Sequence, residues 1–331
     1  MRAMVLGYQD KIENFPLKLK DLPIAEPSDD EVRIKIDTCG ICRTDLHIIE
    51  GDLPAHKLPL IPGHQIVGFV DKVGKNISKF KINDRVGAPW LYKTCGVCHY
   101  CTHEKENLCE TPLFTGYDVD GGYAEYFVIS EDFLYRVPEN YTEEEAAPLL
   151  CGGVIGYYAF TEAKVNKGEK LGLFGLGSSA HITLQIAIHK GMDVYVVARK
   201  ESDFELAHEL GAKWAGKIED LNEKLNSVIV FAPKGELIVR ALEKIMPGGR
   251  VVSAGIYASS IPSFDYSHIY PEKCLTSIAN TTRANVKEFL EVASEFKIKT
   301  KINLYPFEAA NIALQNIKNS KVSGSSVLKI S

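Results

Sequence analysis

Residues 171–180 read Leu171-Gly172-Leu173-Phe174-Gly175-Leu176-Gly177-Ser178-Ser179-Ala180. An apolar run, Leu171–Phe174, stands directly before the pattern G-x-G-x-x-A, and this order predicts a strand, a tight turn and the first turn of a helix. Gly175 permits the tight turn, Gly177 leaves room for a ligand beside the main chain, and Ala180 keeps the helix close to the strand. The stretch therefore predicts the first βα unit of a parallel sheet.

The sequence downstream of this stretch continues to alternate between strands and helices. Such alternation is typical of parallel βαβ units and indicates a doubly wound α/β sheet. The further strands are expected at Asp193–Val197, Val228–Phe231 and Arg250–Ala254, and the helices at Ala180–Lys190, Phe204–Leu210 and Glu236–Ile245.

The first part of the chain is instead β-rich. Apolar and polar residues alternate at Val32–Ile36, and glycines and prolines separate this run from the expected strands Ile66–Val70 and Tyr123–Val128. This pattern predicts a compact β-barrel-like domain. The last stretch can return to that domain, with expected helices at Val286–Phe296 and Ala309–Lys318 and a strand at Ser326–Ile330. The expected domains are residues 1–152 with 286–331, and residues 153–285.

Length and charge limit the class of protein. A chain of 331 residues exceeds what a single core usually organises, which agrees with two domains. The net charge of −5 provides no basic field for nucleic acid or anionic lipid. No apolar run reaches about 18 residues, so no membrane span is expected. The N-terminus turns polar too early for a signal peptide, and we expect a cytoplasmic protein.

The glycine-rich turn predicts a dinucleotide site. The N-terminus of the helix that follows the glycines offers main-chain N–H groups to a pyrophosphate. The alternative is a glycine-rich loop that binds nothing. The expected binding residues are Gly175, Gly177, Ser178, Ser179 and Ala180.

The end of the second strand favours NADP(H) over NAD(H). An NAD site usually has an acidic residue about 20 positions after the glycines, whereas this strand ends in Ala198-Arg199-Lys200. The missing carboxylate removes repulsion against a ribose 2′-phosphate, and Arg199 and Lys200 supply counter-charge. The alternative is that both cations are solvated loop charges, and Glu201 and Asp203 weaken the positive field.

Four cysteines at short spacings form the most specific motif. Gaps of two residues let successive thiolates converge on one ion, and a complete sulfur shell suits a structural Zn²⁺. The metal would replace a hydrophobic core that so short a lobe cannot build. An iron–sulfur cluster also uses four cysteines and stays open as an alternative. The residues are Cys95, Cys98, Cys101 and Cys109.

A second set consists of Cys42, His64 and Cys151. Two cysteines and one histidine can make a three-ligand zinc site with an open fourth position, which is the form of a catalytic site. The three residues lie far apart in the chain, so their spacing is weak evidence. Cys151 is alternatively a core cysteine, and His64 a turn or surface residue.

Several motifs together resemble one known family. Gly40-Ile41-Cys42-Arg43-Thr44-Asp45, Gly63-His64, the four-cysteine motif and Gly175-Leu176-Gly177 occur in the order typical of the zinc-containing medium-chain alcohol dehydrogenases. The resemblance covers essentially the whole chain. It implies a GroES-like β-barrel catalytic domain and a Rossmann domain. It also implies a catalytic zinc on Cys42, His64 and Cys151 and a structural zinc on Cys95, Cys98, Cys101 and Cys109, whereas Cys39 and Cys274 match no ligand position and are interpreted as structural.

The same resemblance implies a reaction. A hydride passes between an alcohol carbon and a nicotinamide cofactor, and zinc polarises the substrate oxygen. Thr44 matches a hydroxyl beside that oxygen, and His47 matches the histidine at the outer end of a proton relay. Asp45 matches a carboxylate that orients the ligand histidine. The ordinary alternatives are a turn threonine, a surface histidine and a helix-capping aspartate.

Three positions set expectations for the pocket. Gln65 stands where the family usually has glutamate, which removes a negative charge near the metal and either makes the zinc more electrophilic or alters ligand exchange. Leu53 and Trp90 match pocket positions, although Trp90 is alternatively barrel core. Leu53 replaces a bulkier aromatic residue of some ethanol-preferring members, which favours a larger alcohol. No charged anchor stands out, so a neutral primary alcohol or aldehyde is expected.

Two other functions stay open. A polyol or cinnamyl-type dehydrogenase would keep the family and the zinc, whereas a zinc- and nucleotide-binding redox sensor would turn over no alcohol. The expected partner is a small neutral alcohol or aldehyde, with neither nucleic acid nor membrane. The resemblance also implies a homodimer or homotetramer.

Overall fold

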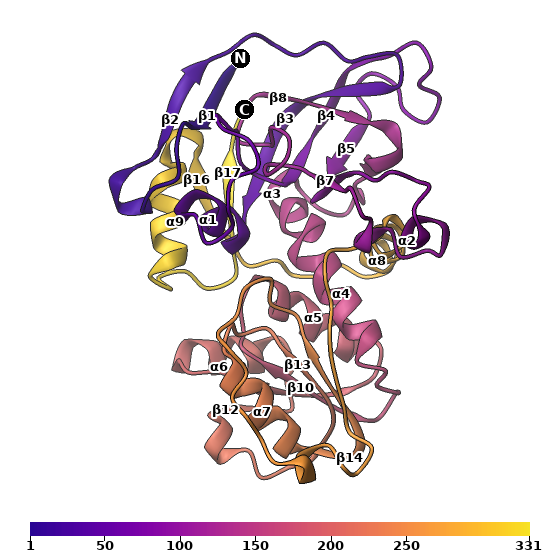
Figure 1. Cartoon of the computed structure of the whole chain (residues 1–331), viewed down its shortest axis with the longest axis vertical. Helices are drawn as coiled ribbons and strands as arrows, with labels where there is room; N and C mark the ends of the chain where they lie inside the picture. Colours follow the sequence, from indigo (N-terminus) through magenta and orange to yellow (C-terminus); the bar gives the residue numbers. More distant parts are fainter. The chain divides into compact units, whose positions relative to one another are not determined.

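The computed structural model describes residues 1–331 and divides into two compact units. The β-rich unit comprises Met1–Cys151 and Asn280–Ser331, and the α/β unit comprises Gly152–Ala279 (Figure 1). The chain leaves the β-rich unit after Cys151, next to the expected boundary. It returns at Asn280, ahead of the expected residue 286, so the residues just before helix α8 (Arg283–Glu295) belong to the β-rich unit.

The β-rich unit is built on a seven-stranded sheet. The strand order is β16-β17-β3-β4-β5-β9, with β8 paired to β3. All pairs are antiparallel except β16 with β17. The strands are β3 (Glu31–Ile41), β4 (Gln65–Val73), β5 (Arg85–Ala88), β8 (Tyr126–Ser130), β9 (Tyr135–Arg136), β16 (Ile302–Pro306) and β17 (Ser325–Lys329).

Strand β3 organises this sheet because three strands pair with it. Its first half alternates as expected, with Val32, Ile34 and Ile36 buried beneath the sheet. Its second half, from Thr38 to Ile41, is buried on both faces, and β17 and β4 pair with it there. The strand therefore delivers the following residue, Cys42, into the interior of the unit.

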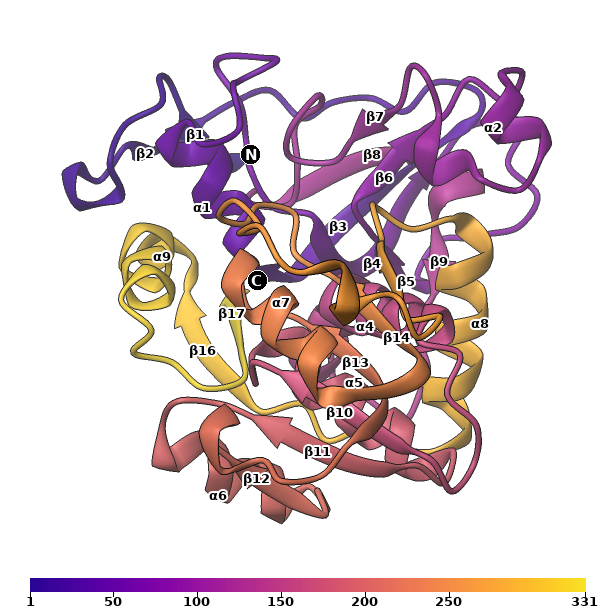
Figure 2. The ribbon, with the colours of Figure 1, turned by 60° about the horizontal axis from the view of Figure 1, so that its bottom comes forward.

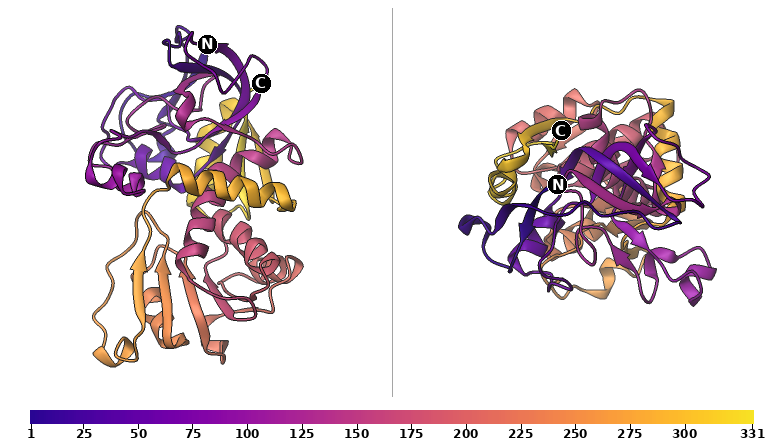
Figure 3. Two further views of the ribbon diagram at one scale, coloured as in Figure 1. Left: turned by 90° about the vertical axis from the view of Figure 1, so that its right-hand side faces the viewer. Right: turned by 90° about the horizontal axis from the view of Figure 1, so that it is seen from above.

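Short elements surround the sheet. Helices α8 and α9 (Ala310–Lys318) lie at opposite sides of the β-rich unit (Figures 2 and 3). None of the helices in the chain is both long and apolar enough to cross a bilayer. The remaining elements of the unit are β1 (Arg2–Leu6), β2 (Leu17–Asp21), β6 (Leu91–Lys93), β7 (Leu113–Phe114), α1 (Arg43–Glu50), α2 (His99–Thr102), α3 (Glu143–Ala146), η1 (Ile12–Asn14), η2 (Glu106–Leu108), η3 (Glu131–Phe133), η4 (Ala147–Leu150) and η7 (Phe307–Ala309).

The α/β unit contains a six-stranded parallel sheet, as the sequence predicts. Its order is β12-β11-β10-β13-β14-β15, so the direction of winding reverses beside β10. Ligands of such sheets bind at the carboxyl ends of the strands flanking this reversal. The elements are α4 (Gly152–Glu162), β10 (Lys170–Phe174), α5 (Ser178–His189), β11 (Asp193–Val197), α6 (Glu201–Glu209), β12 (Trp214–Gly216), η5 (Ile218–Asp220), β13 (Leu225–Val230), α7 (Gly235–Lys244), β14 (Ile245–Ser253), η6 (Tyr266–His268) and β15 (Cys274–Ser277).

Apolar side chains cover both faces of this sheet. Leu171 and Leu173 of β10 are buried in one core cluster, and Phe174 is buried in the other. Full burial of one such side chain contributes about 1.5–3 kcal/mol relative to exposure. The short apolar run seen in the sequence is therefore a central strand, and Gly175 follows at its carboxyl end.

Candidate active site

Cys42 lies at the junction between strand β3 and helix α1. Its backbone is extended, and it caps the helix that begins at Arg43. The Cys42 N–H donates to Asp45 Oδ2 at 2.7 Å. This bond fixes the main chain at the entrance to the helix, and with it the direction of the Cys42 sulfur.

His64 reaches the same place from the turn before strand β4. Gly63 has a φ of +97°, and a Cβ on it would lie 2.3 Å from the Tyr123 ring, so only glycine fits this turn. The His64 side chain is buried, and its Nδ1 lies 3.0 Å from Asp45 Oδ1. A carboxylate only accepts, so Nδ1 carries the hydrogen and Nε2 is left to face a ligand.

Cys151 completes the group at the end of η4. Its sulfur lies 3.3 Å from His64 Nε2 and 4.0 Å from Cys42 Sγ. The three donor atoms all lie within 4.8 Å of one another. Zinc–sulfur bonds of about 2.3 Å in a tetrahedron would put two sulfurs about 3.8 Å apart. The donor set and its spacing therefore fit one Zn²⁺ with a fourth position open.

The two sulfurs titrate as a pair. The Cys151 thiol donates to the Cys42 sulfur, and this bond lowers the pKa of Cys42 well below its usual value although burial opposes it. The pKa of Cys151 is raised well above its usual value, because it gives up that hydrogen last and is itself buried. A divalent cation would displace the remaining proton.

The second cysteine group lies in the lobe of residues 95–109. The four sulfurs of Cys95, Cys98, Cys101 and Cys109 also lie within 4.8 Å of one another. N–H groups of Val97 and Cys98 point at the Cys95 sulfur and lower the pKa of that thiol to about 6. Val97 is 82% exposed and Leu108 41% exposed, so the lobe has almost no core of its own. This group fits a structural metal.

Helix α1 places Thr44 and His47 on one face, since residues three apart are neighbours on a helix. Thr44 Oγ1 lies 3.5 Å from the Cys42 sulfur, beside the candidate metal position. His47 is 8% exposed, and its Nδ1 lies 2.7 Å from Asp52 Oδ2. Sequence reasoning missed Asp52, because no motif marks it and only the Gly51 turn after the helix brings it back to His47.

An aromatic wall formed by Trp90, Phe114 and Tyr117 stands beside His64. The Trp90 ring meets the His64 ring edge-on at 4.8 Å and stacks on Phe114 at 4.8 Å. Leu53 packs in the same apolar cluster. The structure thus brings the two expected pocket residues together. It adds Phe114 and Tyr117, which no sequence signal singled out because β6 and β7 pair only in the folded chain.

The glycine-rich turn of the α/β unit has the expected form. Gly175 follows β10 with a φ of +98°, and Gly177 is extended immediately before helix α5. A Cβ added at Gly177 would meet no atom within 4 Å, so its main chain faces open space. Ala198 is 9% exposed at the end of β11, and Arg199 and Lys200 are exposed beyond it. This end of the sheet can accept a phosphate-bearing ligand.

Comparisons with known proteins agree with these arrangements. Residues 28–139 match the alcohol dehydrogenase GroES-like domain. A probable alcohol dehydrogenase, AdhA, of Mycobacterium tuberculosis is 39% identical over 100% of this chain and 97% of its own length. An alcohol dehydrogenase of Geobacillus stearothermophilus is 37% identical over 96% of this chain and 98% of its own length. The chain belongs to the zinc-containing medium-chain alcohol dehydrogenases.

Solved structures of this family have the same fold. A cinnamyl alcohol dehydrogenase of Sorghum bicolor superposes with a TM-score of 0.90 at 27% identity, over 99% of this chain and 97% of the other. CAD from Helicobacter pylori, solved in complex with NADP(H), gives 0.89 at 27% identity, over 99% of both chains. This chain is accordingly an oxidoreductase, an alcohol dehydrogenase with a GroES-like and a Rossmann part.

Gln65 departs from the family pattern at a buried position. This alcohol dehydrogenase keeps its Gln65 side chain 3% exposed, and a Cβ on Gly40 would lie 2.8 Å from Gln65 Oε1. The amide therefore packs against the main chain of β3 at Gly40. Burial of a neutral amide costs less than burial of a carboxylate, and the position suits a residue without charge.

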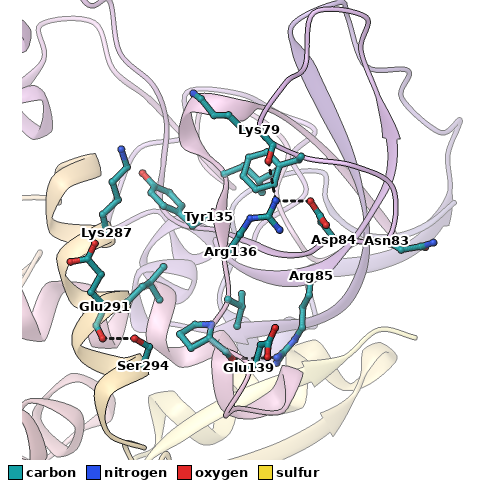
Figure 4. A pocket seen from close by; sticks show the side chains of 15 residues that line it. Lys79, Asn83, Asp84, Arg85, Tyr135, Arg136, Glu139, Lys287, Glu291 and Ser294 are labelled. Atoms are coloured by element: carbon teal, nitrogen blue, oxygen red, sulfur yellow. Dashed lines mark hydrogen bonds and ion pairs between the residues drawn. The ribbon is translucent and has the colours of Figure 1, made fainter.

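One hollow of this alcohol dehydrogenase contains none of the motif residues (Figure 4). It lies between the residues before β5, strand β9 and helix α8. Arg136 donates to Asp84 at 2.8 Å, and Arg85 pairs with Glu143 at 3.0 Å. Protein carboxylates thus already neutralise these two cations.

Proposed function

We propose that this enzyme is a zinc-dependent alcohol dehydrogenase and aldehyde reductase that favours NADP(H). The observation that carries the proposal is the convergence of Cys42 Sγ, His64 Nε2 and Cys151 Sγ, with Asp45 holding the histidine by its other nitrogen. A Zn²⁺ held by these residues would act as a Lewis acid that lowers the pKa of an alcohol hydroxyl. The nicotinamide would supply the hydride acceptor.

Two residues of helix α1 would handle the hydroxyl proton. Thr44 lies closest to the donor atoms and accepts a hydrogen bond from the substrate hydroxyl. His47 lies one turn further along and exchanges protons with solvent, and Asp52 fixes its ring through Nδ1. A histidine suits this task because its ordinary pKa lies near neutrality.

The preference for NADP(H) rests on the end of strand β11. Ala198 offers no carboxylate to a ribose 2′-hydroxyl, and the exposed Arg199 and Lys200 can neutralise a 2′-phosphate. Gly175, Gly177, Ser178, Ser179 and Ala180 would hold the pyrophosphate through main-chain N–H groups and the helix terminus.

The substrate would be a neutral primary alcohol or the corresponding aldehyde. The wall of Trp90, Phe114 and Tyr117 beside His64 is apolar, and Leu53 extends it. Flat aromatic faces favour conjugated substrates through offset stacking. This wall supports a cinnamyl-type activity as a second candidate, and nothing in it favours a polyol.

A paired assay tests the proposal. The purified enzyme is given NADPH or NADH with ethanal, hexanal, benzaldehyde and cinnamaldehyde, and zinc is measured per chain. We expect two zinc ions per chain, higher kcat/KM with NADPH, and better turnover of the larger aldehydes. A zinc- and nucleotide-binding redox sensor would reduce none of them, and that result would overturn the proposal.

We also propose that the enzyme is a homodimer or homotetramer in which a second copy covers the edge of the parallel sheet. Strand β15 is an edge strand, and Tyr266 and Tyr270 just before it are 68% and 71% exposed. Unpaired edges flanked by exposed aromatic residues favour association. Tyr270→Glu should lower the mass measured by light scattering, whereas Tyr8→Glu in the β-rich unit should not.

A further inference from the structure

The indole of Trp90 is fixed by more than its aromatic neighbours. Its only polar atom, Nε1, donates to Asn280 Oδ1 at 3.0 Å. Stacking on Phe114 sets the plane of the indole but does not fix its position within that plane, because apolar contact is non-directional. The directional bond to Asn280 removes that freedom and selects one position of the ring beside His64.

Asn280 is itself held in one orientation. Its Nδ2 donates to the main-chain carbonyl of Asn107 at 3.0 Å. The indole N–H can only donate and the carbonyl can only accept, so the two partners fix which end of the amide faces each. Asn280 has a φ of +54°, a left-handed conformation that asparagine tolerates better than most residues.

The carbonyl of Asn107 belongs to the four-cysteine lobe, two residues before Cys109. The neighbouring Glu106 accepts from the Arg283 main-chain N–H at 2.7 Å and from Arg283 Nη2 at 2.7 Å. Glu106 and Asn107 are both buried. The lobe therefore binds residues 280–283 through two contacts, Asn107 with Asn280 and Glu106 with Arg283. Asn280 in turn holds the indole through its second hydrogen bond.

We propose that Asn280 is a positioning residue that holds Trp90 in the substrate pocket and thereby sets the preference between bulky and small alcohols. The inference rests on the proposed function, because the Trp90 ring must contact substrate. The lobe of residues 95–109 would then affect selectivity as well as stability. It is connected to the wall beside His64 through the hydrogen bonds from Asn280 to Asn107 and from Trp90 to Asn280.

Asn280→Gly tests this role, since glycine keeps the left-handed backbone and removes both hydrogen bonds. Asn83→Gly is the matched control, because Asn83 is also left-handed, with a φ of +70°, but is exposed and lies before strand β5, at the opposite end of that strand from Trp90. Asn280→Asp keeps an acceptor for the indole and loses the donor to Asn107. We expect Asn280→Gly to change the ratio of kcat/KM for cinnamyl alcohol over ethanol by about fivefold, the effect of one hydrogen bond, and Asn280→Asp to change it less.

A double-mutant cycle separates positioning from a general structural effect. In a Trp90→Phe background no indole N–H remains, so Asn280→Gly should change the ratio no further. An equal change in both backgrounds would overturn the inference. So would an unchanged ratio in Asn280→Gly with intact Trp90.

Fluorescence provides a readout that needs no turnover. The chain has two tryptophans, and a Trp214→Phe background leaves Trp90 as the sole emitter. Asn280→Gly should shift that emission to longer wavelength, whereas Asn83→Gly should leave it in place. Unchanged emission would overturn the positioning of Trp90. A shifted emission in an enzyme that oxidises no alcohol would instead overturn the proposed function and the selectivity that depends on it.

Discussion

Asp45 Oδ1 lies 3.0 Å from His64 Nδ1 in the interior of the β-rich unit. The other oxygen of the same carboxylate accepts the Cys42 N–H at 2.7 Å and the Tyr123 hydroxyl at 3.2 Å. One buried carboxylate thus orients two of the three donors that we assign to the catalytic metal.

Asp45→Asn should therefore weaken metal binding. Loss of such a carboxylate partner typically lowers metal affinity by about 10–100-fold. We expect the variant to lose zinc to a chelator at correspondingly lower chelator concentration, with kcat falling in parallel. Asp37→Asn is the control, since Asp37 pairs with Lys329 away from the three donors. Equal zinc retention in Asp45→Asn and the parent would refute the orienting role.

Cys42→Ser should abolish turnover and leave the fold intact. The residue follows β3 and caps α1, and it is not a member of the surrounding apolar core. Loss of Lewis-acid assistance removes several kcal/mol of transition-state stabilisation, so kcat/KM should fall by on the order of a thousandfold or more. Circular dichroism and the thermal midpoint should stay close to those of the parent. Near-parental activity would show that the metal ligands lie elsewhere.

Cys98→Ser should instead destabilise the protein. The lobe of residues 95–109 exposes its apolar side chains and has little else to hold it. We expect the thermal midpoint to fall by about 4 °C or more, which corresponds to roughly 1–2 kcal/mol in a domain of this size. Cys274→Ser, outside both cysteine groups, is the control. A midpoint that is unchanged in Cys98→Ser would contradict a structural metal in the lobe.

Arg199→Ala should discriminate between the two nicotinamide cofactors. A charge-assisted hydrogen bond to a 2′-phosphate contributes about 1.5–3 kcal/mol, so KM for NADPH should rise about tenfold or more while KM for NADH changes little. Arg240→Ala, which breaks a surface pair with Glu219 in the same unit, serves as the control. An equal rise of KM for both cofactors would show that Arg199 does not bind the 2′-phosphate.

The pair of Asp84 and Arg136 predicts a pH-dependent contribution to stability. Hydrogen bonds from Arg136 and the Lys81 main chain lower the pKa of Asp84. A carboxyl group with a lowered folded-state pKa stabilises the fold above its ordinary pKa and loses that effect as pH falls through the lowered value. Asp84→Asn should thus lower the urea midpoint at pH 7 and have progressively less effect below pH 4, the ordinary range for this group. A difference that stays constant down to pH 3 would contradict this account.

Local motifs in the sequence were enough to predict much of the fold. The strand before Gly175 and the helix after it follow from apolar length and glycine placement, and both occur as expected in β10 and α5. The boundary at Asn280, where the chain re-enters the β-rich unit, could not be predicted from local motifs. Its position depends on bonds to Trp90 and Asn107, which lie far away in the sequence.

The candidate site shows the same division. Zinc is a suitable ligand partner for the residue types found at Cys42, His64 and Cys151. Their donor atoms come together only because β3 pairs with β4 and η4 ends beside them. Asp52 and Phe114 carry no motif and become neighbours of His47 and Trp90 through a turn and a short strand pair. The kind of ligand that a side chain can bind can thus be predicted from its residue type. Which side chains lie close together is known only from the tertiary fold.

The pairing of β17 with β3 has a consequence for synthesis of the chain. Ser326 pairs with Ile41 and Val327 with Gly40, immediately before the chain reaches Cys42. The α/β unit is a continuous segment, so it can fold while the ribosome still holds the residues that follow it. The β-rich unit cannot close until residues 325–329 have emerged. The group of Cys42, His64 and Cys151 should therefore be the last part of the nascent protein to form, after the α/β unit is already folded.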